Sequence, residues 1–364
     1  MQTFFNLAVL ATLASNAFAQ TSTLCDPTKT SCPADPALGT THEWYFNTTL
    51  DTTIWNMTTG GYTTTDEGAE FTISKEGEST LLQSNFYIFF GVVESWVKMA
   101  VGGGVISSVV LESDDLDEID WEWVGYNTSQ VQSNFFGKGN NTTFDRGGFH
   151  AVANADTEFH NYTTYWNSDR LEWWIDGELV RTVPYSTNST LQGKNYPQTP
   201  CQVKFSVWPA GLKGAAPGTI EWAGGLVDYS KGPFTMTVQK IRVQDFHTGK
   251  EYSYGDHSGD WESIKVAEGI STILDHINNP PKSLAEKWDD LGTGAHVGVY
   301  VGAAAAAGLV IVALGLYCMR KRRQGRLEHA LGNDQYNNER NEMQNYQNDW
   351  KASEWRTSGY HQVK

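Results

Sequence analysis

The run DEIDWE at residues 117–122 places acidic side chains at alternating positions. In an extended strand alternate side chains share a face, so Glu118, Asp120 and Glu122 are expected to point the same way. Close like charges repel, which raises the pKa of at least one member of such a cluster. Retaining cleavage of a glycosidic bond needs one ionised carboxylate as nucleophile and one protonated carboxyl as acid. The run therefore predicts a retaining, glycan-cleaving site.

The spacing of these acids also sets a geometric condition. Residues four apart on a flat strand have Cα atoms about 13 Å apart, whereas the two carboxyl groups of a retaining enzyme lie about 5 Å apart. We therefore expect the strand to curve and the two glutamates to lean together across the sugar. The alternatives are a calcium site or an acidic solvated strand. Calcium ligands usually come from loops with carbonyl oxygens, and the flanking tryptophans disfavour a solvated strand.

A second alternating run, QVKFSVW at residues 202–208, carries candidate sugar-binding residues. Its Val and Phe side chains face one way, and Lys204 and Trp208 face the other. A tryptophan beside polar groups suits stacking on the apolar C–H face of a pyranose. We predict that Lys204, Trp208 and Thr219 bind the substrate together with Glu122.

The chain shows no spacing typical of a metal or cofactor site, so we expect neither. No His-Glu-x-x-His motif occurs, and His150 and His160 are interpreted as hydrogen-bonded histidines of a β-core. Most of the 14 tryptophans must fill the core, and Trp121 and Trp123 are assigned to packing. The net charge of -16 argues against a nucleic-acid partner and is compatible with a neutral polysaccharide.

Short alternating runs between about residues 41 and 266 must position these side chains. They are rich in Thr, Val, Tyr, Phe and Trp, are separated by Gly, Asn and Asp, and include no long apolar stretch of helical period. Asp176-Gly177 after one such run is a hairpin signal. The pattern predicts one all-β domain, a β-sandwich or jelly roll.

Both ends of the chain carry membrane-targeting features. Residues 1–19 have the apolar run and the small-residue Ala-Phe-Ala site of a signal peptide. An uncharged apolar run at about residues 297–318 is long enough to cross a bilayer as a helix, and a basic cluster at residues 320–326 follows it. We expect a single-pass type I protein at the extracellular face of the plasma membrane or in the cell wall. A glycolipid anchor is the disfavoured alternative, because a long polar segment follows the apolar run.

These features predict five segments, which are a signal peptide at residues 1–19, a catalytic domain at 20–275, a stalk at 276–294, a transmembrane helix at 295–318 and a disordered cytoplasmic tail at 319–364. Cys25 and Cys32 flank a Pro-containing turn and are predicted to form a disulfide, leaving Cys201 as a buried thiol. Glycosylation is expected at the Asn-x-Ser/Thr sequons, which stop before the apolar run: Asn47, Asn56, Asn127, Asn140, Asn141, Asn161 and Asn188.

Longer motifs around the acids resemble one family. DEIDWEW looks like the Glu-x-Asp-x-Glu signature of glycoside hydrolase family 16, a β-jelly-roll family. Its context resembles the Crh family of fungal cell-wall transglycosylases, through almost the whole β-domain. The matching motifs are SSVVLESDDL at residues 107–116, TSQVQ at 128–132, FGKG at 136–139, HNY at 160–162, WIDG at 174–177 and GTIEWAGG at 218–225.

The resemblance implies roles for the three acids: Glu118 as the nucleophile, Asp120 as its assisting carboxylate and Glu122 as the general acid/base. It also implies an enzyme that cleaves chitin as donor and transfers the fragment to β-glucan or chitin as acceptor, with some chitinase activity when water is the acceptor. A plain endo-hydrolase of chitin or β-glucan is the alternative within the same class. A catalytically silent wall-binding receptor is the alternative from another class, which the complete set of acids disfavours.

Overall fold

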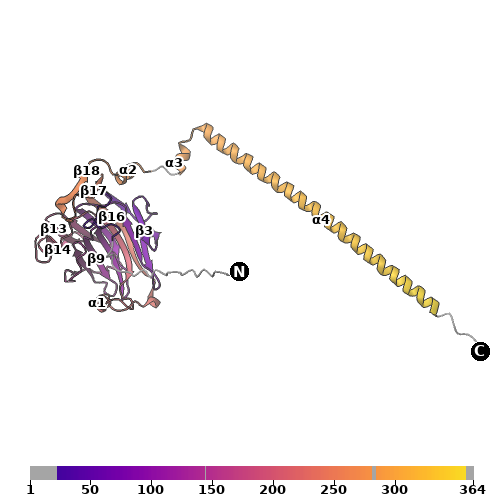
Figure 1. Ribbon diagram of the computed structural model, residues 1–364, viewed down its shortest axis with the longest axis horizontal. Coiled ribbons are helices and arrows are strands. Elements are labelled where there is room, and N and C mark those ends of the chain that lie inside the picture. Colours follow the sequence, from indigo (N-terminus) through magenta and orange to yellow (C-terminus); the bar gives the residue numbers. More distant parts are fainter. Residues whose placement is uncertain (1–22, 144, 281–283, 358–364) are drawn as a thin grey trace, which may run out of the picture. The chain divides into compact units, whose positions relative to one another are not determined.

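Two units make up the chain, one up to Pro280 and one from Pro281 onward (Figure 1). The computed structural model describes residues 23–143, 145–280 and 284–357. The expected signal peptide therefore lies outside the described residues. The first unit contains the β-strands, and all residues of its buried hydrophobic core lie between Ala37 and Ile273.

Two antiparallel sheets pack face to face in the first unit. One is seven-stranded, in the order β11 (Gly148–Ala151), β10 (Gln130–Phe136), β9 (Glu118–Val124), β8 (Val105–Ser113), β15 (Cys201–Pro209), β6 (Thr80–Ser84) and β3 (Trp55–Thr59). The other sheet has eight strands. Seven of them follow the order β14 (Glu178–Pro184), β13 (Arg170–Ile175), β12 (His160–Trp166), β7 (Gly91–Lys98), β16 (Phe234–Asp245), β5 (Gly68–Ile73) and β4 (Tyr62–Thr65). The eighth, β2 (Thr41–Tyr45), also pairs with β16.

Smaller elements close the ends of this sandwich. A three-stranded sheet joins β1 (Asp35–Pro36), β17 (Glu251–Tyr254) and β18 (Ile264–Ala267). The helical elements are α1 (Pro217–Trp222), the 3-10 turns Tyr229–Lys231 and Trp261–Ser263, and α2 (Thr272–Asn278). Ile273 of α2 is buried in the core, so this helix packs onto the sandwich.

Aromatic side chains between the two sheets form much of the core. Trp121 and Trp123 of β9 are 1% and 0% exposed. Both contact Tyr162 of the opposite sheet edge-on, with ring centroids 5.5 Å and 4.6 Å apart. The period-two alternation thus buries one face of β9 between the sheets and leaves the other for the acids. The predicted all-β sandwich and the packing role of the two tryptophans are confirmed.

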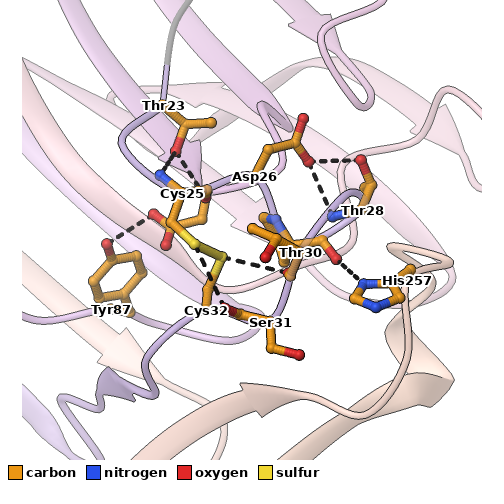
Figure 2. The surroundings of a disulfide bond; sticks show 11 residues. Thr23, Cys25, Asp26, Thr28, Thr30, Ser31, Cys32, Tyr87 and His257 are labelled. Atoms are coloured by element: carbon orange, nitrogen blue, oxygen red, sulfur yellow. Dashed lines mark hydrogen bonds between the residues drawn. A yellow bond between two sulfur atoms is a disulfide. The ribbon is translucent and has the colours of Figure 1, made fainter.

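A disulfide joins Cys25 to Cys32, as predicted (Figure 2). The ring nitrogen Nδ1 of His257 lies 2.6 Å from the carbonyl oxygen of Pro27, which attaches the disulfide loop to the segment after β17. Cys201 is a buried free thiol. None of the sequon asparagines is buried, and sugar attachment at them stays a prediction.

The second unit is helical, with α3 (Leu284–Asp289) and α4 (Thr293–Thr357). Helix α4 contains a stretch long and apolar enough to cross a membrane. The prediction of a disordered segment from residue 319 was wrong for the residues up to Thr357, which continue α4 as helix. Composition alone suggested disorder, but residues 319–357 include six Arg, four Glu and four Gln and no Pro. Such residues extend an existing helix easily, because propagation avoids the cost of nucleation.

Candidate active site

The three acids of β9 share one face with residues of the neighbouring strands. Antiparallel pairing sets Glu118 opposite Glu112 of β8, and Glu122 opposite Gln132 of β10. Directly opposed residues lie on the same side of a sheet. Glu118 and Glu122 are partly exposed, whereas Asp120 between them is 1% exposed. This side of the seven-stranded sheet, away from the core, therefore forms the candidate active-site face.

Asp120 is the most strongly perturbed of the three acids. Burial raises the pKa of its carboxyl well above the usual range, and the charges of Glu118 and Glu122 raise it further. In the described part of the chain, no N–H or hydroxyl group donates to either of its carboxyl oxygens. A hydrogen bond with Glu118 also raises the pKa of Asp120. These effects favour the protonated form of Asp120, which donates in its hydrogen bond with Glu118.

Glu118 experiences opposing influences. Burial raises the pKa of its carboxyl, while the hydrogen bond with Asp120 and the positive charge of Lys204 lower it. Both lowering influences stabilise the ionised form. Glu118 is therefore the member of the set whose neighbours favour its ionised form, as a nucleophile requires.

The surroundings of Glu122 favour its protonated form instead. Burial, and then the negative charge of Glu118, raise the pKa of its carboxyl to about 8. Most Glu122 side chains therefore carry a proton at pH 7. The strand thus places a carboxyl whose neighbours favour ionisation on one side of Asp120 and a carboxyl with a raised pKa on the other, which are the two roles that glycoside cleavage requires.

Lys204 lies on the same face, as expected, but its ammonium group is engaged. Its Nζ lies 2.6 Å from Oε2 of Glu112, and the two residues are 5% and 4% exposed. Burial raises the pKa of Glu112 to about 7, while Lys204 lowers it. Sequence reasoning missed Glu112. The same alternation could have identified it. Val110 pairs with both Lys204 and Asp120 on the neighbouring strands, and Glu112 lies two residues later, on the same face.

Two tryptophans border the acids. Trp208 of β15 and Trp222 of α1 have ring centroids 6.2 Å apart at an angle of 34°. The indole Nε1 of Trp222 donates a hydrogen bond of 2.9 Å to Oε1 of Gln132, the cross-strand neighbour of Glu122. Ile106 and three other apolar residues pack beneath the two rings. The pair therefore forms a supported aromatic surface beside Glu122.

Thr219, the remaining predicted binding residue, lies on α1 three residues before Trp222 and is partly exposed. Helix α1 also carries the Trp222 ring to Gln132. Sequence reasoning missed Trp222 and Gln132, because the position of a short helix after a loop depends on tertiary packing. The substrate-binding roles of Lys204, Trp208 and Thr219 stay predictions.

The fold is an antiparallel β-sandwich, and the exposed face of one strand carries an ionisable carboxylate, a shared proton and a protonated carboxyl. This combination defines an enzyme of the glycosidase class. The comparisons with known proteins agree. The family described as "Glycosyl hydrolases family 16" matches residues 49–224, which contain all of β9 and β15. The chain is 60% identical to Crh-like protein 3 of Aspergillus fumigatus over 363 residues, covering 100% of both chains.

Two further relatives support the assignment. A Crh-like protein of Arthroderma benhamiae is 46% identical over 350 residues, covering 95% of this chain and 94% of its own. The solved structure described as "Crh5 transglycosylase in complex with NAG" is 44% identical with a TM-score of 0.64, covering 66% of this chain and 99% of that chain. This chain belongs to glycosyl hydrolase family 16 and, within it, to the Crh-like proteins, as its motifs predicted.

Proposed function

We propose that the chain is a retaining cell-wall transglycosylase that cleaves chitin and transfers the fragment to β-glucan or chitin. The observation that carries this proposal is the set of three carboxyls on one face of β9. Asp120 and Lys204 lower the pKa of Glu118, whereas burial raises that of Asp120 and, together with Glu118, raises that of Glu122 to about 8. A relative described as "Crh5 transglycosylase in complex with NAG" supports both the transfer reaction and an N-acetylglucosamine polymer as donor.

The first step forms a covalent intermediate. A carboxylate oxygen of Glu118 attacks the anomeric carbon, and the bond from that carbon to the glycosidic oxygen breaks. Glu122 transfers its proton to the departing oxygen, which leaves as the hydroxyl of the released sugar chain. The hydrogen bond from Asp120 orients the attacking carboxylate and keeps the adjacent carboxyl uncharged.

The second step transfers the fragment. Glu122, now ionised, takes the proton from an acceptor hydroxyl, whose oxygen attacks the anomeric carbon and releases Glu118. A sugar acceptor gives transfer and water gives hydrolysis. The aromatic surface formed by Trp208 and Trp222 lies beside Glu122. A sugar stacked there presents its hydroxyls to Glu122 ahead of water.

The proposal includes a location. The apolar stretch of α4 anchors the chain in the plasma membrane, with the catalytic unit outside and the basic cluster after the span inside. The enzyme would then act at the inner surface of the wall, on polymers that reach it. Protease protection of the C-terminal end in sealed vesicles would support this orientation, and its cleavage from outside would contradict it.

Label transfer separates the proposed activity from its alternatives. The fragment 20–280, which contains its own core, is incubated with chitin oligomers and a fluorescent laminarin oligomer. Transfer of chitin units onto the label supports the transglycosylase. Hydrolysis without transfer identifies the plain hydrolase, and oligomers that bind but stay intact identify a silent receptor.

The activity should fall as the pH rises through about 8. The first step needs protonated Glu122, and burial together with Glu118 raises its pKa to about 8, so raising the pH above this value removes the acid. We expect kcat/KM on chitin oligomers to fall about ten-fold per pH unit above that point. Donors with an activated phenolic leaving group need no proton from Glu122, so their kcat/KM should fall less over the same pH range, and they serve as the control. A profile that rises between pH 7 and 9 on chitin oligomers would contradict this assignment.

Replacing Trp208 by alanine should weaken sugar binding more than chemistry. The change removes an aromatic face that partly covers a sugar ring, so we expect KM for the acceptor to rise roughly ten-fold with kcat within about three-fold. The ratio of transfer to hydrolysis should fall, because water competes better. Trp208→Phe keeps an aromatic face and is the matched control. Equal transfer ratios in the wild type and Trp208→Ala would refute the stacking role.

A further inference from the structure

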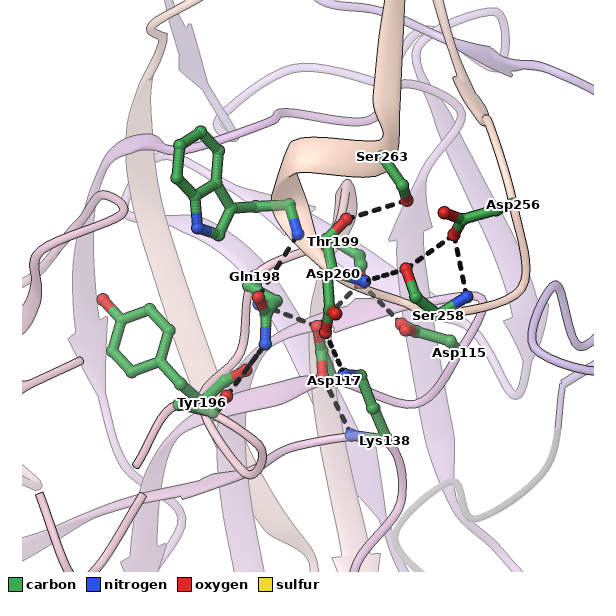
Figure 3. Close-up of polar contacts among 12 residues, drawn as sticks. Asp115, Asp117, Lys138, Tyr196, Gln198, Thr199, Asp256, Ser258, Asp260 and Ser263 are labelled. Atoms are coloured by element: carbon green, nitrogen blue, oxygen red, sulfur yellow. Dashed lines mark hydrogen bonds and ion pairs between the residues drawn. The ribbon is translucent and has the colours of Figure 1, made fainter. Parts of the chain in front are cut away.

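The turn between β8 and β9 delivers Glu118 to the active-site face, and Asp117 anchors it. The Asp117 side chain is 0% exposed. Its Oδ1 accepts a hydrogen bond from the backbone N–H of Lys138 at 2.8 Å, and its Oδ2 accepts one from the N–H of Gln198 at 2.7 Å (Figure 3). These two donors belong to the loops after β10 and before β15. Asp117 thus ties the start of β9 to two separate loops.

A second buried carboxyl joins this anchor through one hydroxyl group. Oγ1 of Thr199 lies 2.8 Å from Oδ2 of Asp117 and 2.5 Å from Oδ1 of Asp115. Asp115 is 3% exposed and also accepts a hydrogen bond from Ser113 Oγ at 2.6 Å. The Ser113 hydroxyl in turn accepts the backbone N–H of Asp117 at 2.9 Å. The turn is therefore held from both sides by the same small network.

Counting hydrogens shows that this network contains an additional proton. The Thr199 hydroxyl has one hydrogen but makes two short contacts with carboxyl oxygens, and a proton on one of the carboxyls makes both contacts full hydrogen bonds. Asp117 already accepts two backbone N–H groups, which favours its ionised form. The two carboxyls and the hydroxyl therefore share one proton, which the backbone N–H groups on Asp117 direct toward Asp115.

Burial favours retention of that proton, because it raises the pKa of both Asp115 and Asp117. The charge of Lys138 lowers the pKa of Asp115, but its Nζ also pairs with Asp260 at 2.7 Å. The other titratable groups that interact electrostatically with the pair are Asp35 of β1, Cys201 of β15, Tyr254 of β17 and Tyr196. None of these four groups brings a positive charge.

We propose that Asp115, Thr199 and Asp117, which are joined by one shared proton, hold the nucleophile Glu118 in position. We call these three residues the relay. The inference rests on the proposed function only in taking Glu118 as the nucleophile. Loss of the relay proton places two buried negative charges on one hydroxyl, which loosens the turn and misplaces the adjacent carboxylate. Loss of the relay proton should therefore lower the activity at high pH, independently of the loss of the Glu122 proton.

The hydroxyl bridge can be tested by a matched pair of variants. Thr199→Val removes the bridge, whereas Thr199→Ser retains it. With an activated phenolic chitin oligomer as donor, we expect Thr199→Val to lower kcat at least ten-fold with KM within about two-fold. Thr199→Ser should stay within about two-fold of the wild type. Equal kcat in Thr199→Val and Thr199→Ser would overturn the proposal.

The relay proton is tested by Asp115→Asn, whose amide cannot ionise. A carboxyl whose pKa is raised by folding loses stability as the pH rises from its unfolded value near 4 toward its folded value. The wild-type Tm should therefore fall between pH 5 and 9 relative to that of Asp115→Asn. On the activated donor, the ratio of kcat at pH 9 to kcat at pH 6 should rise at least three-fold in this variant. Parallel pH profiles in both measurements would overturn the proposal.

The two measurements also separate this inference from the proposed function. Tm against pH reports on the relay even if the wild type neither cleaves nor transfers chitin. An inactive wild type whose Tm still depends on Asp115 in the expected direction would contradict the proposed function and leave the relay proton supported. An active wild type with no effect at Asp115 or Thr199 would contradict the relay alone.

Discussion

Replacing Glu118 by glutamine is expected to lower both transfer and hydrolysis by at least about four orders of magnitude, which corresponds to roughly 5 kcal/mol of lost transition-state stabilisation. Glutamine has nearly the same shape but provides no anionic oxygen to attack the anomeric carbon. Asp120 also loses the carboxylate that accepts its proton. The two losses fall on the same step, so no change of donor should restore the rate.

The measurement is label transfer and reducing-end release with the fragment 20–280. Glu70→Gln, on β5 of the other sheet, is the matched control and should keep wild-type rates. Circular dichroism checks that Glu118→Gln is folded. A folded variant with more than about one per cent of wild-type transfer would exclude Glu118 as the nucleophile.

Replacing Glu122 by glutamine should produce a different pattern, with an effect that depends on the leaving group. On chitin oligomers we expect a loss of about three orders of magnitude, because the glycosidic oxygen then leaves without a proton. On a donor with a phenolic leaving group the first step should survive. The second step should remain slow, since glutamine cannot take the proton of an acceptor hydroxyl.

A burst experiment measures this difference. Glu122→Gln and an activated donor should release phenol with an initial burst close to the enzyme concentration, followed by slow turnover. Added azide, which attacks without needing a general base, should speed the second phase. Equal losses on both kinds of donor, with no burst, would contradict the acid/base role of Glu122.

The alternation of side chains was enough to predict much of the site. It placed Glu118, Asp120 and Glu122 on one face, and it placed Lys204 and Trp208 on that face too. Burial of Trp121 on the opposite face followed from the same period. These predictions depended only on local strand geometry, which the sequence pattern states directly.

Partners that come from distant parts of the chain were not predictable in this way. The contact of Trp222 with Gln132 requires α1 to fold back on β10. The ion pair of Lys204 with Glu112 joins residues 92 positions apart. Such contacts are fixed by strand order and loop packing, which period-two patterns do not encode.

The division of protons among the acids also needed the structure. Like charges predicted that one pKa would rise, but not which one. Burial raises the pKa of Asp120 between the two partly exposed glutamates, whereas Lys204 lowers that of Glu118. The helical extension of α4 to Thr357 was missed for another reason, because composition describes an isolated segment and not one that continues a formed helix.

The most direct test of the account is to trap the covalent intermediate. Glu122→Gln is mixed with an activated chitin-oligomer donor, quenched in acid within seconds, digested and analysed by mass spectrometry. The account predicts that the peptide containing Glu118 gains the mass of the transferred fragment, and that the double variant Glu118→Gln/Glu122→Gln shows no such gain. Phenol release without any adduct, or an adduct on a different residue, would contradict retaining transfer through Glu118.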